Sequence, residues 1–289
     1  MIPAYTIAPT RPQAPLADTP YMTWSLGDED DWAAFYRLPD GYLVRFQSLC
    51  DFFIESGGSE ALCTPAPGLD EATREHVFYN QVAPLMLSEA GWLVFHASCV
   101  EVEGGAIAFI AQSGRGKSTL AALFATAGHR FLCDDAMVIS PRGGQYDVLP
   151  NQPHIRLWSD SRSALLGEGA NIAEPISYTP KERVMCAEGL PYCDQPRTLR
   201  AAYFLGDRRP PKARFTPLEG AEALAAWASA VFTLDVDDRR MLAGQFERLA
   251  PLSQTIPTTR LDYRRSYARA GVLRQSILAH ASTLLQATS

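Results

Sequence analysis

The chain has 289 residues, of which 47% are hydrophobic and 20% are charged, and its formal net charge is −6. This composition is typical of a globular protein with one large or two small domains. The acidic balance argues against a nucleic-acid partner, because phosphate-backbone binding needs a basic face. No run of eighteen apolar residues could span a bilayer, and the N-terminus lacks the apolar core of a signal peptide, so we expect a cytoplasmic protein with no membrane partner.

The first third of the chain predicts strands and one helix. Residues 1–20 are rich in proline and are expected to be irregular. Residues 41–56 contain β-forming residues that favour one or two strands before the Gly57-Gly58 turn. Residues 69–91 place apolar side chains at helical spacing, with Asp70 near the start and Gly91 at the end.

The cysteines predict no disulfide framework. None of the six forms a CxxC pair, and two of them lie inside apolar runs. We therefore expect buried free thiols rather than disulfides or a zinc site. The six are Cys50, Cys63, Cys99, Cys133, Cys186 and Cys193.

The middle of the chain predicts an α/β core that binds phosphate. Residues 92–112 are interpreted as two apolar strands joined by a tight turn at Glu103-Gly104-Gly105. The second strand leads into the sequence SGRGKST, a short helix follows until Gly128, and residues 130–140 form a strand interrupted by two aspartates. The order strand, glycine-rich loop, helix, strand is typical of such cores.

The last part of the chain is predicted to contain further strands and helices. Residues 140–158 contain turn signals between short strands, and the stretch from there to about residue 197 is expected to be irregular. The remaining predicted elements are a strand at 199–206, helices at 220–232 and 237–252, a strand at 258–263 and a closing helix at 268–286.

The glycine-rich loop has the residues that a bound triphosphate needs. Gly114 and Gly116 allow the backbone N–H groups to surround phosphate oxygens, and the next helix directs its positive end at them. Lys117 would contact the β- and γ-phosphates, and the Ser118 hydroxyl would bind Mg²⁺. The ATP-binding residues are accordingly predicted to be Ser113, Gly114, Arg115, Gly116, Lys117, Ser118 and Thr119. Ala111 replaces the usual first glycine, which costs little unless its φ is positive.

Residues 96–135 resemble the catalytic core of the HPr kinase/phosphorylase family. The resemblance is carried by a histidine that opens a strand pair, the glycine-rich loop, the sequence GHR and the double aspartate at the expected spacing. It implies an α/β fold of the HPr-kinase C-terminal-domain type, a mixed sheet with flanking helices. We expect this domain at residues 91–289, preceded by a small β-containing region at residues 1–90.

The same resemblance implies roles for three residues. Asp134 looks like the family's catalytic base, Asp135 like the residue that anchors Mg²⁺, and His96 like the histidine beside the base. Both aspartates can face the nucleotide only if the strand has ended, because neighbouring side chains on a strand point to opposite faces. We also expect a distal cation at the transferring phosphate. The candidates are Arg115, Arg156, Lys181 and Arg183, with Arg156 preferred.

The resemblance implies an ATP- and Mg²⁺-dependent kinase for a serine hydroxyl on a peptide or small protein. Thr119 departs from the family's acidic residue, and a later glycine-and-asparagine signature is missing, which puts phosphorolysis in doubt. The chain is more similar to shorter members of biosynthetic gene clusters, including kinases for the C-terminal serine of lasso-peptide precursors. Two alternatives remain open: a small-molecule or carboxykinase-like phosphotransferase, and a non-catalytic nucleotide sensor. Oligomerisation with a second copy also remains open.

The predicted topology explains why the loop and the acid pair are so close in sequence. The helix after Lys117 would make a single crossover between neighbouring strands, so that Lys117 and the aspartates meet at one carboxyl edge of the sheet.

Overall fold

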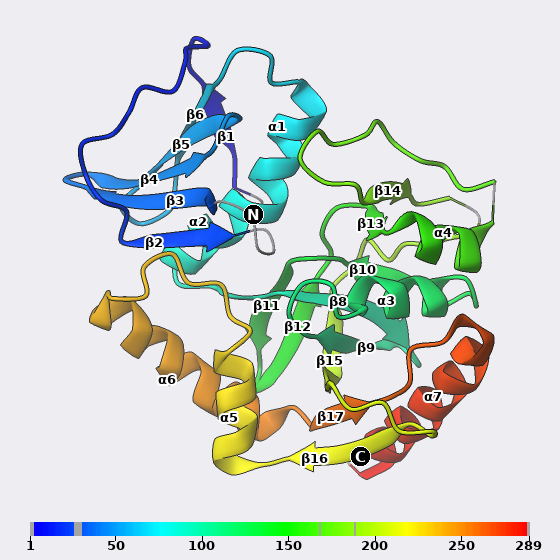
Figure 1. Ribbon diagram of the computed structural model, residues 1–289. Helices are drawn as coiled ribbons and strands as arrows, with labels where there is room; N and C mark the ends of the chain where they lie inside the picture. Colours follow the sequence, from blue (N-terminus) through cyan, green and yellow to red (C-terminus); the bar gives the residue numbers. More distant parts are fainter. Residues whose placement is uncertain (1–2, 26–30, 168, 188, 288–289) are drawn as a thin grey trace. The chain divides into compact units, whose positions relative to one another are not determined.

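The computed structural model describes residues 3–25, 31–167, 169–187 and 189–287 (Figure 1). The chain forms two compact units. The N-terminal unit comprises residues 1–92 with residues 176–178 and 233–241, and the C-terminal unit comprises the rest. No described helix is long and apolar enough to cross a membrane.

The N-terminal unit contains a six-stranded sheet with the strand order β1-β6-β5-β4-β3-β2. All neighbouring strands are antiparallel except β1 and β6, which run parallel. One or two strands were expected within residues 41–56, and two are present. The expectation of an irregular N-terminus was wrong for β1, which gains backbone partners from β6. The strands are β1 (Tyr5–Ile7), β2 (Met22–Ser25), β3 (Asp31–Leu38), β4 (Gly41–Phe46), β5 (Cys50–Glu55) and β6 (Ala61–Pro65).

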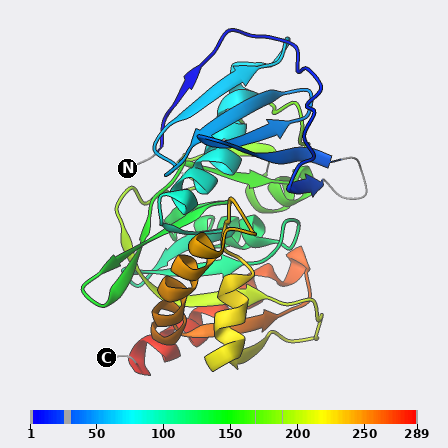
Figure 2. The ribbon, with the colours of Figure 1, turned by 90° about the vertical axis from the view of Figure 1, so that its left-hand side faces the viewer.

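One interrupted helix belongs to this unit and lies beside its sheet (Figure 2). It consists of α1 (Glu71–Val77), the π-helical turn η1 (Phe78–Val82) and α2 (Ala83–Glu89). The predicted cap is confirmed, because the Asp70 carboxylate accepts a hydrogen bond from the backbone N–H of Thr73 at 2.7 Å. The wide turn immediately precedes Pro84, which has no N–H to donate to the preceding turn.

The C-terminal unit is built on a nine-stranded mixed sheet. Its path is β10-β8-β9-β15-β12-β11-β7, and β17 pairs with both β15 and β16. The strands β9, β15 and β17 run parallel to one another. The strands are β7 (Leu93–Phe95), β8 (Ala97–Val102), β9 (Gly105–Ile110), β10 (Phe131–Cys133), β11 (Met137–Arg142), β12 (Gln145–Leu149), β15 (Arg197–Leu205), β16 (Arg214–Leu218) and β17 (Thr258–Asp262).

Helices cover both faces of this sheet, and the central strand β9 shows how. Its residues are all buried and alternate between the two faces. Ile107 and Phe109 pack in a core with α3 and α7, whereas Ala108 and Ile110 pack in a second core with α5 and α6. The C-terminal unit therefore has three layers (Figure 1). The helices are α3 (Lys117–Ala125), α5 (Gly220–Ala228), α6 (Arg239–Thr255) and α7 (Ala270–Ala287), with the short 3₁₀ turn η2 (Tyr267–Arg269) before α7.

A small two-stranded sheet and a helix lie between residues 154 and 185, and most of this stretch was expected to be irregular. The strands β13 (His154–Leu157) and β14 (Glu182–Met185) pair antiparallel, and α4 (Ser159–Leu166) follows β13 directly. The sequence prediction was wrong for α4 and β14. The helix α4 is short and mostly polar, and its leucines, Leu165 and Leu166, both lie at its C-terminal end. It therefore lacks the helical spacing of apolar residues by which a helix is predicted.

The strands that carry the glycine-rich loop and the acid pair are not neighbours, contrary to the expected single crossover. The strand β8 lies between β9 and β10 and is antiparallel to both. Because β8 starts at the edge where β9 and β10 end, it brings His96 and Ser98 to the same edge as the loop. The common carboxyl edge of β9 and β10 is as expected, but it is shared across one intervening strand.

Candidate active site

The glycine-rich loop connects β9 to α3. Gly114 has φ of 75° and Gly116 has φ of 94°, a region that side chains rarely adopt, so the two predicted glycines are needed for the shape of the loop. Ala111 is not among the described residues with positive φ, which explains why alanine is tolerated there. The helix α3 begins at Lys117, so its first N–H groups point toward the space above the loop.

The loop lysine is held by its own loop. The Lys117 Nζ donates hydrogen bonds to the carbonyl oxygens of Ala111 at 2.8 Å and Gln112 at 3.1 Å. The side chain is buried, and burial lowers the pKa of Lys117 to about 8, against the effect of the nearby Asp135 and Asp134 carboxylates.

The strand before the acid pair ends at Cys133, so the two aspartates do not alternate across a sheet. Asp135 has φ of 64°, a left-handed conformation that Asp tolerates better than most residues. This turn allows both carboxylates to be buried at the same edge of the sheet.

The Asp134 carboxylate is bonded to the loop and to β8. Its Oδ1 accepts hydrogen bonds from the Ser98 hydroxyl at 2.5 Å and from the Ser118 hydroxyl at 2.9 Å. Its Oδ2 accepts from the backbone N–H of Arg156 at 2.9 Å. Burial and the neighbouring Asp135 raise the pKa of Asp134, although the three hydrogen bonds oppose the rise.

The Asp135 carboxylate pairs with the preferred distal cation. The Arg156 Nη1 lies 2.8 Å from the Asp135 Oδ2, and both side chains are buried. Burial raises the pKa of Asp135, but Arg156, His96, Lys181 and Lys117 outweigh it and hold that pKa well below the ordinary range. The carboxylate is therefore ionised at neutral pH.

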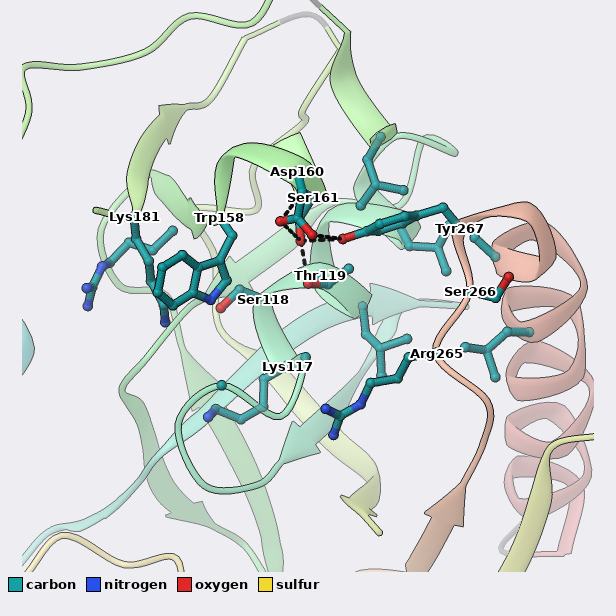
Figure 3. Close-up of a pocket in the computed structure, with 18 of the residues that line it drawn as sticks. Lys117, Ser118, Thr119, Trp158, Asp160, Ser161, Lys181, Arg265, Ser266 and Tyr267 are labelled. Atoms are coloured by element: carbon teal, nitrogen blue, oxygen red, sulfur yellow. Dashed lines mark hydrogen bonds between the residues drawn. The ribbon is translucent and has the colours of Figure 1, made fainter. Parts of the chain in front are cut away.

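These residues surround a cavity of 680 Å³ within the C-terminal unit (Figure 3). Its walls contain Gly114, Gly116, Lys117, Ser118 and Thr119 from the loop and α3, together with Asp135 and Arg156. Asp134 is not among the lining residues, since it lies behind Ser118. The cavity thus joins the predicted nucleotide loop to one of the two predicted acidic residues.

The four candidate cations are placed differently. Arg156 and Lys181 line the cavity, and Lys181 makes no salt bridge within the described part of the chain. Arg115 pairs with Asp207 at the surface, and Arg183 donates to the backbone carbonyl of Glu174 at 3.1 Å. Ser113 is exposed in the loop. The structure therefore favours Arg156 and Lys181 as the cations that could reach a ligand.

Several residues of the cavity were missed by the sequence prediction. One set follows β13, and another follows β17 at the edge of the sheet where the loop lies. The parallel pairing of β17 with β15, and of β15 with β9, would have indicated the second set, because carboxyl ends of parallel strands meet at one edge. The missed residues include Trp158, Ser159, Asp160, Ser161, Tyr263, Arg265, Ser266 and Tyr267.

His96 lies between β7 and β8, where its backbone N–H donates to the Ala230 carbonyl at 3.0 Å. Enclosure of the ring lowers the pKa of His96 to about 3, and the cations Lys117, Lys181 and Arg156 act in the same direction. Its imidazole is therefore neutral at physiological pH. A neutral ring can orient a neighbouring carboxylate but does not contribute a charge.

We expect the NMR signals of the His96 ring to stay unchanged between pH 5 and pH 8, because its pKa of about 3 lies below that window. The measurement is a pH titration of the ring Cε1–H resonances, with a His96→Gln variant to assign the signal. A His96 titration midpoint near 6.5 would contradict the prediction.

Comparisons with known proteins give likenesses among solved structures only. No protein-family model matches the sequence, and no curated protein matches it. Among solved structures, an Hpr(Ser) kinase/phosphatase from Coxiella burnetii is similar at 10% sequence identity and a TM-score of 0.36, over 66% of this chain and 97% of that one. The function of the chain is therefore inferred from the residues of its site.

Proposed function

We propose that this chain is an ATP- and Mg²⁺-dependent kinase of the HPr-kinase-like type that phosphorylates a serine hydroxyl of a peptide or small protein. One observation carries the proposal: the loop residues Lys117 and Ser118 and the acid pair converge on one cavity, with Asp134 bonded to Ser118 and Asp135 in the wall. The resemblance of residues 96–135 to the family core supports the same function.

Ser118 and Asp134 are the residues that would hold Mg²⁺. Their oxygens lie 2.9 Å apart, and Mg²⁺ prefers oxygen ligands from one or two protein groups together with substrate phosphates and water. When bound there, the ion would offset charge on the β- and γ-phosphates. The hydrogen bonds from Ser98 and from the Arg156 backbone fix the Asp134 carboxylate in place for this role.

Asp135 is the better-placed proton acceptor. It lines the cavity, and one of its oxygens is bonded to Arg156, whereas both oxygens of Asp134 are bonded to neighbouring groups. The lowered pKa of Asp135 keeps this carboxylate ionised and able to accept a proton, although it makes Asp135 the weaker base of the two. The contacts thus favour the reverse of the roles expected from the resemblance, with Asp134 at the metal and Asp135 at the acceptor. In transfer, the serine oxygen bonds to the γ-phosphorus, its proton passes to Asp135, and the bond to the β–γ bridging oxygen breaks to release ADP.

Two cations would stabilise the charge on the transferring phosphate. Arg156 is fixed by its pairing with Asp135, and Lys181 lies over the Trp158 ring at 5.9 Å from its centroid. Lys117 adds a third charge from the loop. Such fixed charges around the γ-phosphate are the main way in which kinases lower the barrier to transfer.

For the acceptor, we propose the C-terminal serine of a lasso-peptide precursor. The similarity to the shorter biosynthetic-cluster proteins supports this choice.

The test is mass spectrometry of peptides incubated with the full chain and Mg-ATP. We expect an added phosphate on a peptide with a free C-terminal serine, and much less on the same peptide with an amidated C-terminus. ADP should form only when an acceptor is present. Equal ADP release with and without acceptor would instead favour an ATPase switch, and phosphorylation of small molecules alone would favour the small-molecule alternative.

A further inference from the structure

The cavity has a polar part and an apolar part, and only the polar part is used by the proposed transfer. The polar part contains Lys117, Ser118, Asp135, Arg156 and Lys181. The apolar part is lined by side chains from three helices, and these are Leu120 and Leu123 of α3, Leu165 of α4, and Ala270 and Leu273 of α7. No step of phosphoryl transfer needs these apolar groups.

The apolar part lies along the helix that begins at the glycine-rich loop. Leu120 and Leu123 follow Lys117 by three and six residues, so they lie about 4.5 and 9 Å farther along the axis of α3. Thr119, which lies beside them at the start of the helix, also lines the cavity. A nucleotide whose terminal phosphates are at Lys117 can therefore extend along this face, with its other end among the leucines.

Tyr267 forms a fixed wall of this part. Its hydroxyl lies 2.8 Å from the Ser161 hydroxyl and donates to the Asp160 carboxylate at 3.1 Å. Tyr267 is 44% exposed. The hydrogen bonds at its hydroxyl fix the position of the side chain, and much of the ring surface stays accessible to a ligand. Figure 3 shows Tyr267 on one side of Thr119, and Trp158 and Lys181 on the other side.

We infer that the apolar part of the cavity is the binding site for the nucleobase, which stacks against Tyr267 and contacts the leucine and alanine side chains. This inference rests on the proposed function for the position of the phosphates at Lys117. The acceptor then enters from the opposite side, past Lys181 and Asp135, so base and acceptor do not compete for space. The flat π-face of a nucleobase suits an aromatic ring with aliphatic neighbours, and stacking of this kind tolerates different bases because every base has such a face.

The test compares ATP with inorganic tripolyphosphate, which has the phosphates but no base, as ligands in titration calorimetry. Tyr267→Ala should weaken ATP binding about tenfold and leave tripolyphosphate binding unchanged. Tyr267→Phe keeps the ring and should stay within about threefold of the wild type. Ala270→Trp places a large side chain in the apolar part and should also weaken the binding of ATP alone. The control is Val272→Trp, at a residue of the same helix that is 67% exposed, and it should change the binding of neither ligand.

The outcomes separate this inference from the proposed function. If Tyr267→Ala and Ala270→Trp leave ATP affinity unchanged, or weaken tripolyphosphate equally, the base site is wrong even where the wild type phosphorylates peptides. If the wild type binds ATP about tenfold more tightly than Tyr267→Ala but phosphorylates no acceptor, the base site holds and the kinase proposal fails. A wild type that binds neither ligand overturns both.

Discussion

Asp135→Asn is expected to lower kcat for peptide phosphorylation by about 10² to 10⁴-fold, the usual contribution of a general base, with ATP affinity changed less than about threefold. Asparagine keeps the shape of the side chain and tolerates the left-handed backbone at residue 135, where φ is 64°. It cannot accept the serine proton. The measurement is steady-state phosphorylation together with calorimetric binding of Mg-ATP.

The matched control is Asp134→Asn. Because Asp134 is bonded to Ser118, this change should weaken ATP binding in the presence of Mg²⁺ and leave metal-free ATP binding unchanged. Thermal unfolding of both variants is needed, since Asp135→Asn also leaves the buried Arg156 without its ion-pair partner. If Asp134→Asn abolishes transfer with intact Mg-ATP binding, and Asp135→Asn affects the metal instead, the roles implied by the family resemblance are correct.

Lys117→Met is expected to remove most activity and yet to make the folded chain more stable at neutral pH. Loss of the charge at the β- and γ-phosphates should lower kcat by about 10² to 10³-fold and weaken ATP binding. The fall in the pKa of Lys117 from 10.5 to about 8 corresponds to a cost of about 3 kcal/mol for burying the charged form. The two hydrogen bonds to the loop offset about 1 kcal/mol each, so the variant should gain about 1 kcal/mol.

The stability gain should depend on pH in a defined direction. Between pH 8 and pH 10.5 the unfolded chain carries a proton on Lys117 that the folded chain does not, so wild-type stability rises with pH in this window. The stability gain of Lys117→Met should therefore be complete below pH 8. By about pH 10.5 the wild type should be the more stable by about 2 kcal/mol, because the burial cost has gone and its two hydrogen bonds remain. Urea unfolding at pH 7 and pH 10 measures it. A variant that is less stable than the wild type at pH 7 would contradict the prediction.

The sequence predicted those parts of the site that lie in one continuous segment. Residues 96–135 contain the strand pair, the loop, α3 and the acid pair, and each is visible in the apolar pattern and in the glycines that the loop shape requires. The sequence showed that the strand must end before the two aspartates if both are to face the nucleotide, but it did not show that β10 ends at Cys133. The left-handed backbone at Asp135 has no sequence signal apart from the residue type.

The rest of the cavity depends on tertiary pairing that the sequence does not disclose. Tyr267 and Arg265 reach the cavity because β17 pairs parallel with β15, and nothing in the residues themselves specifies that partner. The position of β8 between β9 and β10 could not be predicted either, because short apolar strands can pair in several orders. Ser98 shows the result: it is one small residue in an apolar strand, and only the sheet order places it against Asp134.

The hydrogen bonds between Lys117 and the carbonyls of its own loop affect how tightly a phosphate ligand can bind. Before a ligand arrives, the Lys117 ammonium is already occupied by the carbonyls of Ala111 and Gln112. The ammonium has three N–H donors, so an entering phosphate can accept from the third directly and must displace a carbonyl to accept from a second. Because the two carbonyl oxygens belong to the main chain, replacing the side chains at 111 or 112 would not remove their competition with a phosphate for the Lys117 ammonium.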